Sequence, residues 1–439
     1  MNILIVSYAY APSLSPRAIR WSSIVCQWAA GGASIDIVTA PGPGLPAVET
    51  SGTVAIHRVG GIGLENWRSR LGTTGRVDLQ ASATASPHAN GLRRAARFVY
   101  ERTWKRLYWP DYACLWYFPA RRKVRNLLSA RRYDAMVTVA APFTGHLVGL
   151  SCRKHAGHAT WLADYGDPFC YLTITPTNNH ALYRRLNYRV ERALFGAVDR
   201  VTVTTQRTAD CYASLFPEQA AKLYVVPPIL TESFGELRTM PDKSLADVGK
   251  LRLAYVGRFN PPNRVPGPMV DLLLRLLRDH ADLRERLEFH VYGTVAPFEA
   301  LFGRFNEFPG VLHLHGLVDR SAARDALHDS DVLVNLGNLA DYQLPSKLVE
   351  YVAAAKPIIN FLVIQNDSSR EFLRGHPACL NVLLQESINS EALTEITGFL
   401  RRAGTMRIDA AWVADFVAAH RSERIAQSYS ELLAMPNPT

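Results

Sequence analysis

Two arginines that directly follow a predicted buried strand suggest a site for a diphosphate. Residues 253–256 form a short apolar run typical of such a strand, and Gly257, Arg258 and Arg264 come after it. Gly257 allows a ligand to approach the backbone closely. The two guanidinium groups can grip both phosphates of a diphosphate and neutralise the charge that develops on a leaving group. Without other support, the same arginines would be ordinary surface charges.

A second polar segment carries groups that suit a nucleotide. It follows a predicted strand at 332–336, and Pro345 with Ser346 marks the start of a helix. Backbone amides near Ser346 and Lys347 can meet phosphate oxygens. Glu350, one turn further on, can accept hydrogen bonds from ribose hydroxyls. One helix end would therefore present both a cation and a carboxylate to a sugar nucleotide.

The loop after the first predicted strand, at 3–8, is expected to hold an anion. Ser15 suits an N-cap and Pro16 the first position of a helix that ends before Gly31. The amides of this helix start, with Arg17 beside them, would face a ligand at the carboxyl ends of the strands. The loop lacks the Gly-x-Gly-x-x-Gly fingerprint, which counts against an NAD enzyme.

Three polar residues are candidates for the acceptor side of a site, with Ser15 expected beside them. Asp164 and Asp167 follow a predicted strand at 160–163, so they can bind sugar hydroxyls or orient an acceptor. The alternative is structural, because Asp167 and the proline after it can make a turn while Asp164 caps its neighbour. For His146 the structural role is the simpler interpretation. Three further histidines alternate along predicted strands and are assigned to packing or the surface rather than to a metal: His290, His313 and His315.

Short apolar runs alternate with helical stretches along the chain, which predicts parallel sheets covered by helices on both faces. The predicted strands lie at 3–8, 34–39, 135–140, 160–163, 200–204, 223–226, 253–256, 287–292, 311–314, 332–336 and 358–363. One sheet of so many strands is improbable, and the polar stretch 231–250 suits a linker. We therefore expect two Rossmann-like domains, 1–235 and 245–408, facing one another across a cleft, with C-terminal helices at 409–439 packed across them.

The positive charge is concentrated in one segment. The 439 residues include 49 Lys and Arg against 39 Asp and Glu, a net charge of +10, and residues 93–132 alone hold twelve cations and two acids. Apolar residues at helical spacing, with Trp104 and Trp109 beside the cations, suit an anionic membrane surface, so residues 91–132 are the expected contact. A solvated basic face is an equal alternative. Nucleic acid is disfavoured because the cations form one local block without a recognition motif.

Cysteine usage and the N-terminus favour the cytoplasm. The six cysteines lie far apart with no Cys-x-x-Cys, so neither a disulfide framework nor a zinc site is expected. No cation precedes Arg17, so the apolar start lacks the charged region of a secretory signal. We expect a cytoplasmic protein that is peripheral on the inner face of the cytoplasmic membrane if its basic segment binds lipid.

Several short motifs occur together in this chain. They are Ser-Pro-Arg-Ala-Ile-Arg-Trp at 15–21, the segments 141–146 and 163–169, Glu-Arg-Ala before Val-Asp-Arg-Val within 191–201, and Pro-Ser-Lys-Leu-Val-Glu-Tyr at 345–351. In this combination the chain resembles the retaining glycosyltransferases of family 4 (group 1), of the bacterial polysaccharide-biosynthesis type. The resemblance covers nearly the whole chain apart from about residues 60–110. It implies the GT-B fold, in which two Rossmann-like domains with parallel sheets face each other across a cleft.

The resemblance also implies roles for matching positions. The family's diphosphate-gripping Arg and Lys fall on Arg258 and Arg264, and its ribose-binding Glu falls on Glu350. The family's first Glu, which touches the transferred sugar, is replaced by Tyr342, and Asp341 could substitute only after a shift of the loop. The expected catalytic residues are Arg258, Arg264 and Asp167, and the expected donor-binding residues are Gly257, Tyr342, Gln343, Ser346, Lys347, Glu350 and Arg17.

The implied activity is transfer of a sugar from a nucleotide diphosphate donor to a lipid-linked or saccharide acceptor with retention, in cell-surface polysaccharide or lipopolysaccharide biosynthesis. Fixed cations would neutralise the leaving diphosphate, so no cofactor and no metal is expected. Two alternatives remain on the same fold. A sugar-nucleotide epimerase would convert the donor without an acceptor, and a non-catalytic protein would bind nucleotide or scaffold an assembly. Tyr342 lends weight to the second alternative.

Overall fold

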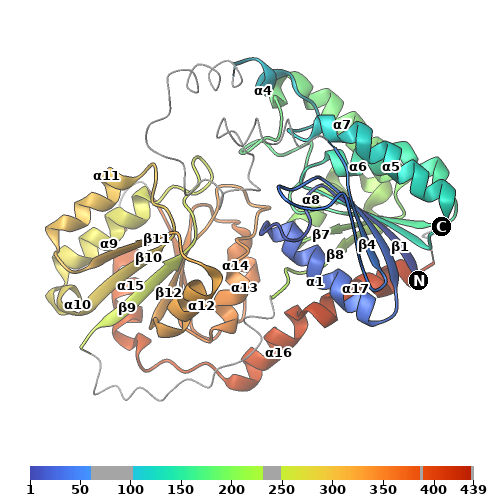
Figure 1. Cartoon of the computed structure of the whole chain (residues 1–439). Coiled ribbons are helices and arrows are strands. Elements are labelled where there is room, and N and C mark those ends of the chain that lie inside the picture. Colours follow the sequence, from blue (N-terminus) through green and yellow to red (C-terminus); the bar gives the residue numbers. More distant parts are fainter. Residues whose placement is uncertain (61–101, 231–248, 386–388, 437–439) are drawn as a thin grey trace. The chain divides into compact units, whose positions relative to one another are not determined.

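The structure is a computed structural model that describes residues 1–60, 102–230, 249–385 and 389–436. The chain divides into two compact units (Figure 1). The first comprises Met1–Pro227 with Ser422–Thr439, and the second comprises Pro228–Arg421. The predicted change of domain between 235 and 245, and the first part of the basic segment at 91–101, lie outside the described residues.

In the described part of the first unit, eight strands form one sheet in the order β3-β4-β2-β1-β5-β6-β7-β8. The strands are β1 (Asn2–Ser7), β2 (Ser34–Thr39), β3 (Val48–Ser51), β4 (Val54–Arg58), β5 (Ala135–Val139), β6 (Thr160–Asp164), β7 (Arg200–Val203) and β8 (Leu223–Val225). Neighbours are parallel except for the antiparallel pair β3 and β4. These two strands were not predicted, because the residues of β3 are all exposed and show no apolar alternation. The other six strands confirm the prediction.

Helix α1 shows how the local sequence sets an element of this unit. It spans Pro16–Ala30, and the hydroxyl of Ser15 at its N-cap accepts a hydrogen bond from the N–H of Ala18 at 3.2 Å. Gly31 ends the helix, so both predicted ends are confirmed. The other helices are α4 (Trp104–Leu107), α5 (Tyr117–Ala130), α6 (Thr144–Cys152), α7 (His180–Ala197), α8 (Gln206–Leu215) and α17 (Ser422–Ala434), with a 3-10 helix η4 (Pro217–Lys222) after α8.

The second unit holds a parallel sheet whose six described strands run in the order β11-β10-β9-β12-β13-β14. The strands are β9 (Leu251–Val256), β10 (Leu287–Tyr292), β11 (Leu312–Gly316), β12 (Val332–Leu336), β13 (Ile358–Leu362) and β14 (Cys379–Leu383). The helices are α9 (Gly267–Asp279), α10 (Ala281–Arg286), α11 (Glu299–Phe302), α12 (Arg320–Asp329), α13 (Leu348–Ala353), α14 (Ser368–Phe372), α15 (Ser390–Ala403) and α16 (Ala410–His420). Five of these strands were predicted, and β14 was not.

Helices cover both faces of this second sheet. Along β9, Leu253 and Tyr255 join a hydrophobic cluster with α9 and α15, whereas Ala254 and Val256 join a second cluster with α12, α13 and α16. Alternate residues of a strand point to opposite faces, so both faces are buried, as is usual for a parallel sheet. The edge left for ligands in such a sheet is the carboxyl end of its strands.

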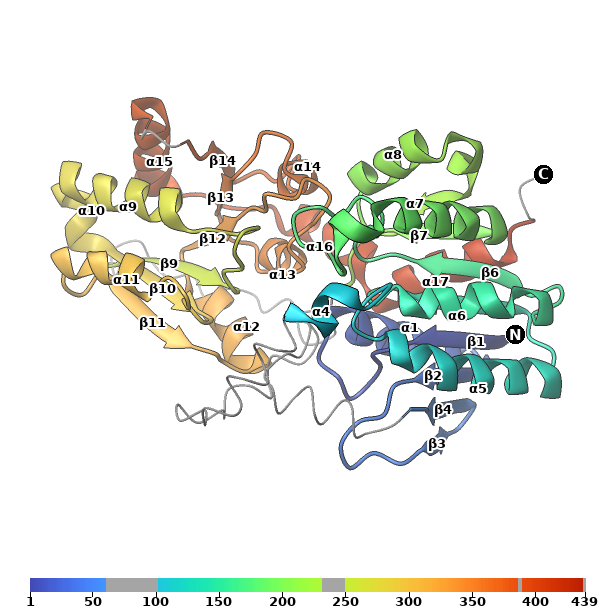
Figure 2. The same cartoon turned by 90° about the horizontal axis from the view of Figure 1, so that it is seen from above.

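The two C-terminal helices belong to different units. Helix α16 contacts α13 within the second unit. Helix α17 packs on α1 within the first unit (Figure 2), where the indole of Trp28 donates a hydrogen bond to the carbonyl of Ala426 at 3.1 Å. Across the described ranges, none of the helices combines the length and the apolar character needed to cross a membrane.

Candidate functional site

The loop after β9 brings Arg258 and Arg264 together. Asn260 and Arg264 exchange two backbone hydrogen bonds, of 3.1 and 2.8 Å, which close the loop. The carbonyl of Arg258 then accepts hydrogen bonds from Tyr255 Oη at 3.2 Å and from Arg264 Nη1 at 3.4 Å. Gly257 is joined to the end of β10, since its N–H donates to the carbonyl of Tyr292 at 2.9 Å. The predicted pair of cations therefore lies on one hydrogen-bonded loop at the carboxyl end of β9.

The guanidinium of Arg258 is half-buried and donates no hydrogen bond to any described residue. Burial lowers the pKa of Arg258 from its usual value, although an arginine stays charged at neutral pH. A partly desolvated cation without a counter-ion is costly to a folded protein unless an anion joins it. The arrangement therefore suits a bound phosphate.

Arg264 is held from behind by residues that the sequence analysis missed. Its Nη2 donates to Asn338 Oδ1 at 2.9 Å, and the N–H of Asn338 donates to Asp367 Oδ2 at 2.9 Å. Burial raises the pKa of Asp367. The hydrogen bonds that Asp367 accepts lower it in part, but burial has the larger effect. Position 337 has no room for a side chain, because a Cβ on Gly337 would lie 2.0 Å from Asp367 Oδ2. The sequence signal was a Gly-Asn pair directly after a buried strand.

Lys347 and Glu350 also meet, at the start of α13. Lys347 Nζ lies 2.7 Å from Glu350 Oε2, and Glu350 is nearly buried. The helix itself begins at Leu348, so the predicted start at Pro345 with Ser346 is wrong by two to three residues, and a turn precedes the helix there.

Helix α13 is fixed to the strand that carries the arginine loop. Tyr351 Oη accepts a hydrogen bond from the N–H of Val256 at 2.8 Å and reaches the carbonyl of Val334 at 3.2 Å. It thereby connects α13 to the last residues of β9 and to β12. The two pairs, the arginines after β9 and the Lys347–Glu350 pair, are thus held at the same edge of the sheet.

The other predicted donor residues lie in the loop before α13. Tyr342 is buried at 6% exposure, and Ser346 is exposed. Gln343 acts as a brace, because its Oε1 accepts from Asn263 Nδ2 at 2.7 Å and its carbonyl accepts from Asn338 Nδ2 at 2.8 Å. Gln343 therefore positions the loop that surrounds Arg264.

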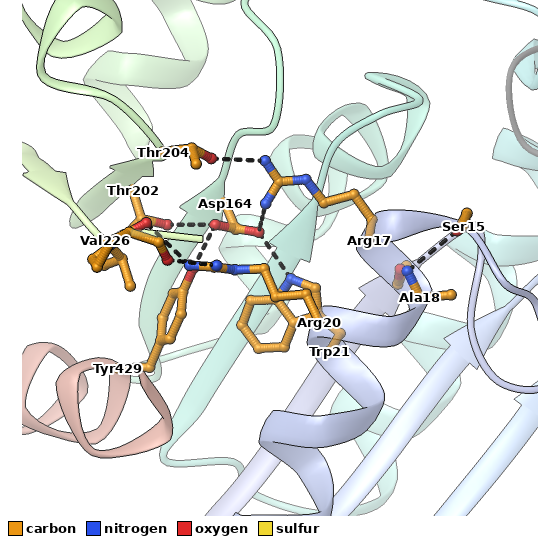
Figure 3. Close-up of polar contacts among 12 residues, drawn as sticks. Ser15, Arg17, Ala18, Arg20, Trp21, Asp164, Thr202, Thr204, Val226 and Tyr429 are labelled. Atoms are coloured by element: carbon orange, nitrogen blue, oxygen red, sulfur yellow. Dashed lines mark hydrogen bonds and ion pairs between the residues drawn. The ribbon is translucent and has the colours of Figure 1, made fainter. Parts of the chain in front are cut away.

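In the first unit, Asp164 is the centre of a buried polar network at the end of β6 (Figure 3). Arg17 Nη1 and the indole of Trp21 donate to its Oδ2, at 2.9 and 2.8 Å. Thr202 Oγ1 and the hydroxyl of Tyr429 donate to its Oδ1, at 2.9 and 2.6 Å. Asp164, expected on the acceptor side, thus has both oxygens occupied within the fold.

The charge of Arg17 is balanced by this network. Burial alone would raise the pKa of Asp164, but Arg17 and Arg20 outweigh it and hold that pKa below its usual value. Arg17 Nη2 also donates to Thr204 Oγ1 at 3.1 Å, and its guanidinium fills the space over Gly166, where a Cβ would lie 2.3 Å away. Arg17 was predicted to bind an anionic ligand, and the structure places it on a buried carboxylate.

Arg20 and Tyr429 are further members that were missed. Arg20 donates to the carbonyls of Pro227 and Val226, at 2.7 and 3.1 Å, and its Nη2 donates to Tyr429 Oη at 3.0 Å (Figure 3). Because the Tyr429 hydroxyl also donates a hydrogen bond to Asp164, helix α17 is tied to α1 and to β6 by one hydroxyl. The Arg-Ala-Ile-Arg-Trp motif therefore has a structural reason: Arg17, Arg20 and Trp21 serve this network.

The remaining predicted acceptor-side residues have separate surroundings in the structure. They are His146, Ser15 and Asp167. His146 is fully buried; burial lowers its pKa to about 3, its Nδ1 lies 2.8 Å from Thr138 Oγ1, and its ring packs 4.5 Å from that of Tyr165. Ser15 caps α1. Asp167 is half-buried in the loop after β6, and this loop is anchored where Glu191 accepts the N–H of Cys170 at 2.8 Å.

Comparisons with known proteins agree with this architecture. Residues 76–231 match the family model described as Glycosyltransferase Family 4. No curated protein sequence matches the chain. Three solved structures are similar over nearly the whole length of both chains: an alpha,alpha-trehalose 6-phosphate synthase from Burkholderia multivorans (12% identity, TM-score 0.61, 99% and 98% covered), a glycosyltransferase from Rickettsia africae (11%, 0.58, 98% and 97%) and HepE from Anabaena in complex with UDP-glucose (12%, 0.55, 99% and 99%).

Identities this low establish the fold alone, and the likeness in sequence rests on the family match over residues 76–231. The predicted fold class and the predicted resemblance are both confirmed. The chain has the GT-B fold, and its residues 76–231 match the model of glycosyltransferase family 4.

Proposed function

We propose that this protein is a retaining glycosyltransferase that moves a sugar from a nucleoside diphosphate donor to a saccharide or lipid-linked acceptor in cell-surface polysaccharide or lipopolysaccharide synthesis. The observation that carries the proposal is the guanidinium of Arg258, which is half-buried, has no partner among the described residues and lies on one loop with Arg264. The Anabaena neighbour holds UDP-glucose, which supports a nucleotide sugar as the donor.

The chemistry follows from the charges at this edge of the sheet. Arg258 and Arg264 neutralise the negative charge that builds on the diphosphate as it leaves. Glu350 keeps Oε1 for ribose hydroxyls while Lys347 holds its Oε2. The acceptor hydroxyl attacks the anomeric carbon on the face from which the diphosphate leaves. The bond from that carbon to the diphosphate breaks, and the leaving phosphate takes the proton of the hydroxyl. Since fixed guanidinium groups supply the positive charge, we propose that the transfer needs no metal.

The alternatives differ in product. An epimerase would convert the donor when no acceptor is present, and a nucleotide-binding scaffold would bind the donor without turnover. Tyr342 stands where the family has a carboxylate, and it is buried. A phenol does not bring the negative charge of a carboxylate to the sugar, which favours the scaffold. Product analysis with the donor alone, and then with a lipid-linked saccharide, separates the three functions.

The direct test is Arg258→Ala. Removing one preorganised cation at a leaving group costs on the order of 10²- to 10³-fold in turnover, and donor binding should weaken as well. Transfer or donor hydrolysis is measured with UDP-glucose first and then with GDP-, ADP- and dTDP-sugars. Arg275→Ala is the matched control, because Arg275 is an exposed arginine of the same unit that pairs with Asp279. Full turnover in Arg258→Ala would refute the phosphate clamp.

A face of the first unit supports the proposed membrane contact. Leu107 of α4, Phe118 of α5 and Leu182 of α7 are 62%, 66% and 58% exposed. The hydroxyl of Tyr183 donates to the carbonyl of Leu107 at 2.7 Å, so α4 lies against α7. Leu186 continues the apolar row one turn further along α7. Large apolar side chains exposed among cations suit the interface of an anionic bilayer.

Arginines of the same helix, α7, line a pocket. A hollow of about 960 Å³ lies against α7 and η4, with the arginines Arg184, Arg185, Arg189 and Arg192 along it. All four are exposed, and Arg192 pairs with Glu218. Each Lys or Arg near an anionic surface contributes about 1 kcal/mol. We propose that this face, which the sequence analysis did not identify beyond residue 132, contacts lipid phosphates and brings a lipid-linked acceptor to the protein.

Vesicle binding tests this part separately. The triple change Arg184→Gln, Arg185→Gln and Arg189→Gln should weaken binding to vesicles with anionic lipid, and the loss should be largest at low salt. A triple change of exposed arginines in the second unit, Arg275, Arg304 and Arg401 to Gln, is the charge-matched control. Equal binding by the two triple variants would refute the membrane proposal while leaving the transferase proposal intact.

A further inference from the structure

A cluster of three histidines and one glutamate lies on β10 and β11. His290 on β10 and His313 on the edge strand β11 are direct partners in the parallel register. Glu288 precedes His290 by two residues on the same strand and so shares its face. Because neighbouring strands lie about 4.8 Å apart, this register brings the three side chains to one spot.

The ligand atoms of these three residues lie close together, and one pair has the spacing of two ligands of one ion. One ligand atom from each of Glu288, His290 and His313 lies within 4.8 Å of the others. Two ligands of a tetrahedral zinc ion, with bonds of about 2.0–2.1 Å, lie roughly 3.3 Å apart. His290 Nε2 and Glu288 Oε2 are 3.4 Å apart, which is long for a hydrogen bond and right for two ligands of one ion.

Hydrogen bonds around the cluster leave the required nitrogen lone pairs available. His313 Nε2 lies 3.0 Å from the carbonyl of Gly310, and a carbonyl only accepts, so the proton is on Nε2 and Nδ1 is left as a ligand. His290 Nδ1 lies 2.9 Å from His315 Nε2. With the proton on His290 Nδ1, His290 Nε2 faces Glu288 unprotonated. His315 therefore orients a ligand as the outer partner of a metal-bound histidine does.

His315 is itself fixed in place. Its ring is stacked on that of Tyr292 at 4.1 Å between centroids, with 5° between the planes. The ligand side chains remain within reach of solvent, since those of His290 and Glu288 are 14% and 16% exposed. One basic group opposes a metal ion here: Arg252 Nε lies 3.4 Å from the same Oε2 of Glu288, and the Arg252 side chain is half-exposed and can swing away. In the described part of the chain, no other group of three such ligands is found.

We propose that Glu288, His290 and His313 form a binding site for a divalent transition metal of the zinc class, oriented by His315. Imidazole and carboxylate ligands suit this class of ion. The ion would clamp the edge strand β11 to β10. This metal site is independent of the proposed sugar transfer, because none of its residues takes part in that reaction.

Zinc titration of the chelator-treated, untagged full chain tests the site by calorimetry. One ion should bind per chain, and the melting temperature should rise with zinc. His290→Ala and His313→Ala should abolish this binding, and His315→Ala should weaken it by about 10- to 100-fold. Exposed His158, in the first unit, provides the control His158→Ala, which should bind like the wild type.

Arg252→Gln adds a test that removes no ligand. Without the competing guanidinium, zinc affinity should increase, whereas a purely structural role for Arg252 would leave it unchanged. Should His290→Ala or His313→Ala fold poorly in the absence of zinc, His290→Gln and His313→Gln replace them. Failure of the wild type to bind zinc, or unchanged zinc binding in both the His290 and the His313 variants, would overturn the proposal.

Discussion

Replacing Asp164 by Asn should destabilise the first unit strongly at neutral pH. The change keeps the shape of the side chain but removes the charge that balances Arg17 and leaves an amide where a carboxylate oxygen accepted hydrogen bonds. Breaking a buried ion pair by removing one partner costs about 3–5 kcal/mol, because the other charge remains buried. Tyr429→Phe, which removes one of the four donors, should cost less, about 1–3 kcal/mol.

The effect should depend on pH in a defined direction. The folded protein holds the pKa of Asp164 below the usual 3.8, so the unfolded chain binds the proton more readily. The stability contributed by Asp164 is therefore complete above about pH 4–5 and is lost as the pH falls through the folded pKa. The difference in stability between wild type and Asp164→Asn should be largest at neutral pH and should shrink below pH ~4.

Urea denaturation measures both effects. Unfolding followed by circular dichroism at pH 7 should show a lower midpoint for Asp164→Asn at an unchanged slope, since the exposed surface is the same. Asp282→Asn is the control, because Asp282 pairs with Arg401 on the surface, where both side chains are half-exposed. A midpoint for Asp164→Asn equal to that of the wild type, or a gap that widens toward acid, would refute the account of this network.

Three further predictions follow from buried contacts. His146 has a folded pKa of about 3 against 6.5 unfolded, so the unfolded chain binds its proton first on acidification, and wild type should lose up to about 2 kcal/mol more than His146→Leu between pH 7 and 5 in urea melts. Gly337→Ala should displace Asp367, and donor KM should rise in steady-state kinetics, whereas an unchanged KM would contradict the role of Asp367 in positioning Arg264. Tyr351→Phe should lower stability by about 1–3 kcal/mol, since the N–H of Val256 loses its acceptor, and thermal melting will show no change if water replaces that hydroxyl.

Much of the framework follows from local signals. The cap at Ser15 and the glycine at 31 fixed both ends of α1, and buried apolar runs located the strands that carry the arginine loop and α13. Strand β14, Cys379–Leu383, has one buried residue among five, so apolar periodicity did not identify it. The start of α13 was placed early because Pro345 and Ser346 form a turn before the helix.

The partners of the charged groups could not be predicted in the same way. Asp164 and Tyr429 are 265 residues apart, and no spacing rule links them. The same holds for Arg264 with Asn338, whose contact depends on the packing of the β9 loop against the end of β12. Arg17 was read as a ligand-binding cation because sequence shows its charge but not the buried carboxylate that neutralises it. The role of Arg258 as a phosphate ligand stays a prediction.

The packing of α17 on the rest of the first unit has a consequence for biosynthesis. Domains generally fold as units and from the N-terminus during translation. Here, however, Tyr429 and the carbonyl of Pro436, which accepts a hydrogen bond from the buried Arg200 at 3.0 Å, come after the whole second unit in the sequence. Arg20 and Arg200 must wait for that segment, so the first unit reaches its final fold only after the second unit has been translated. A nascent chain stalled before residue 422 should remain a client of chaperones.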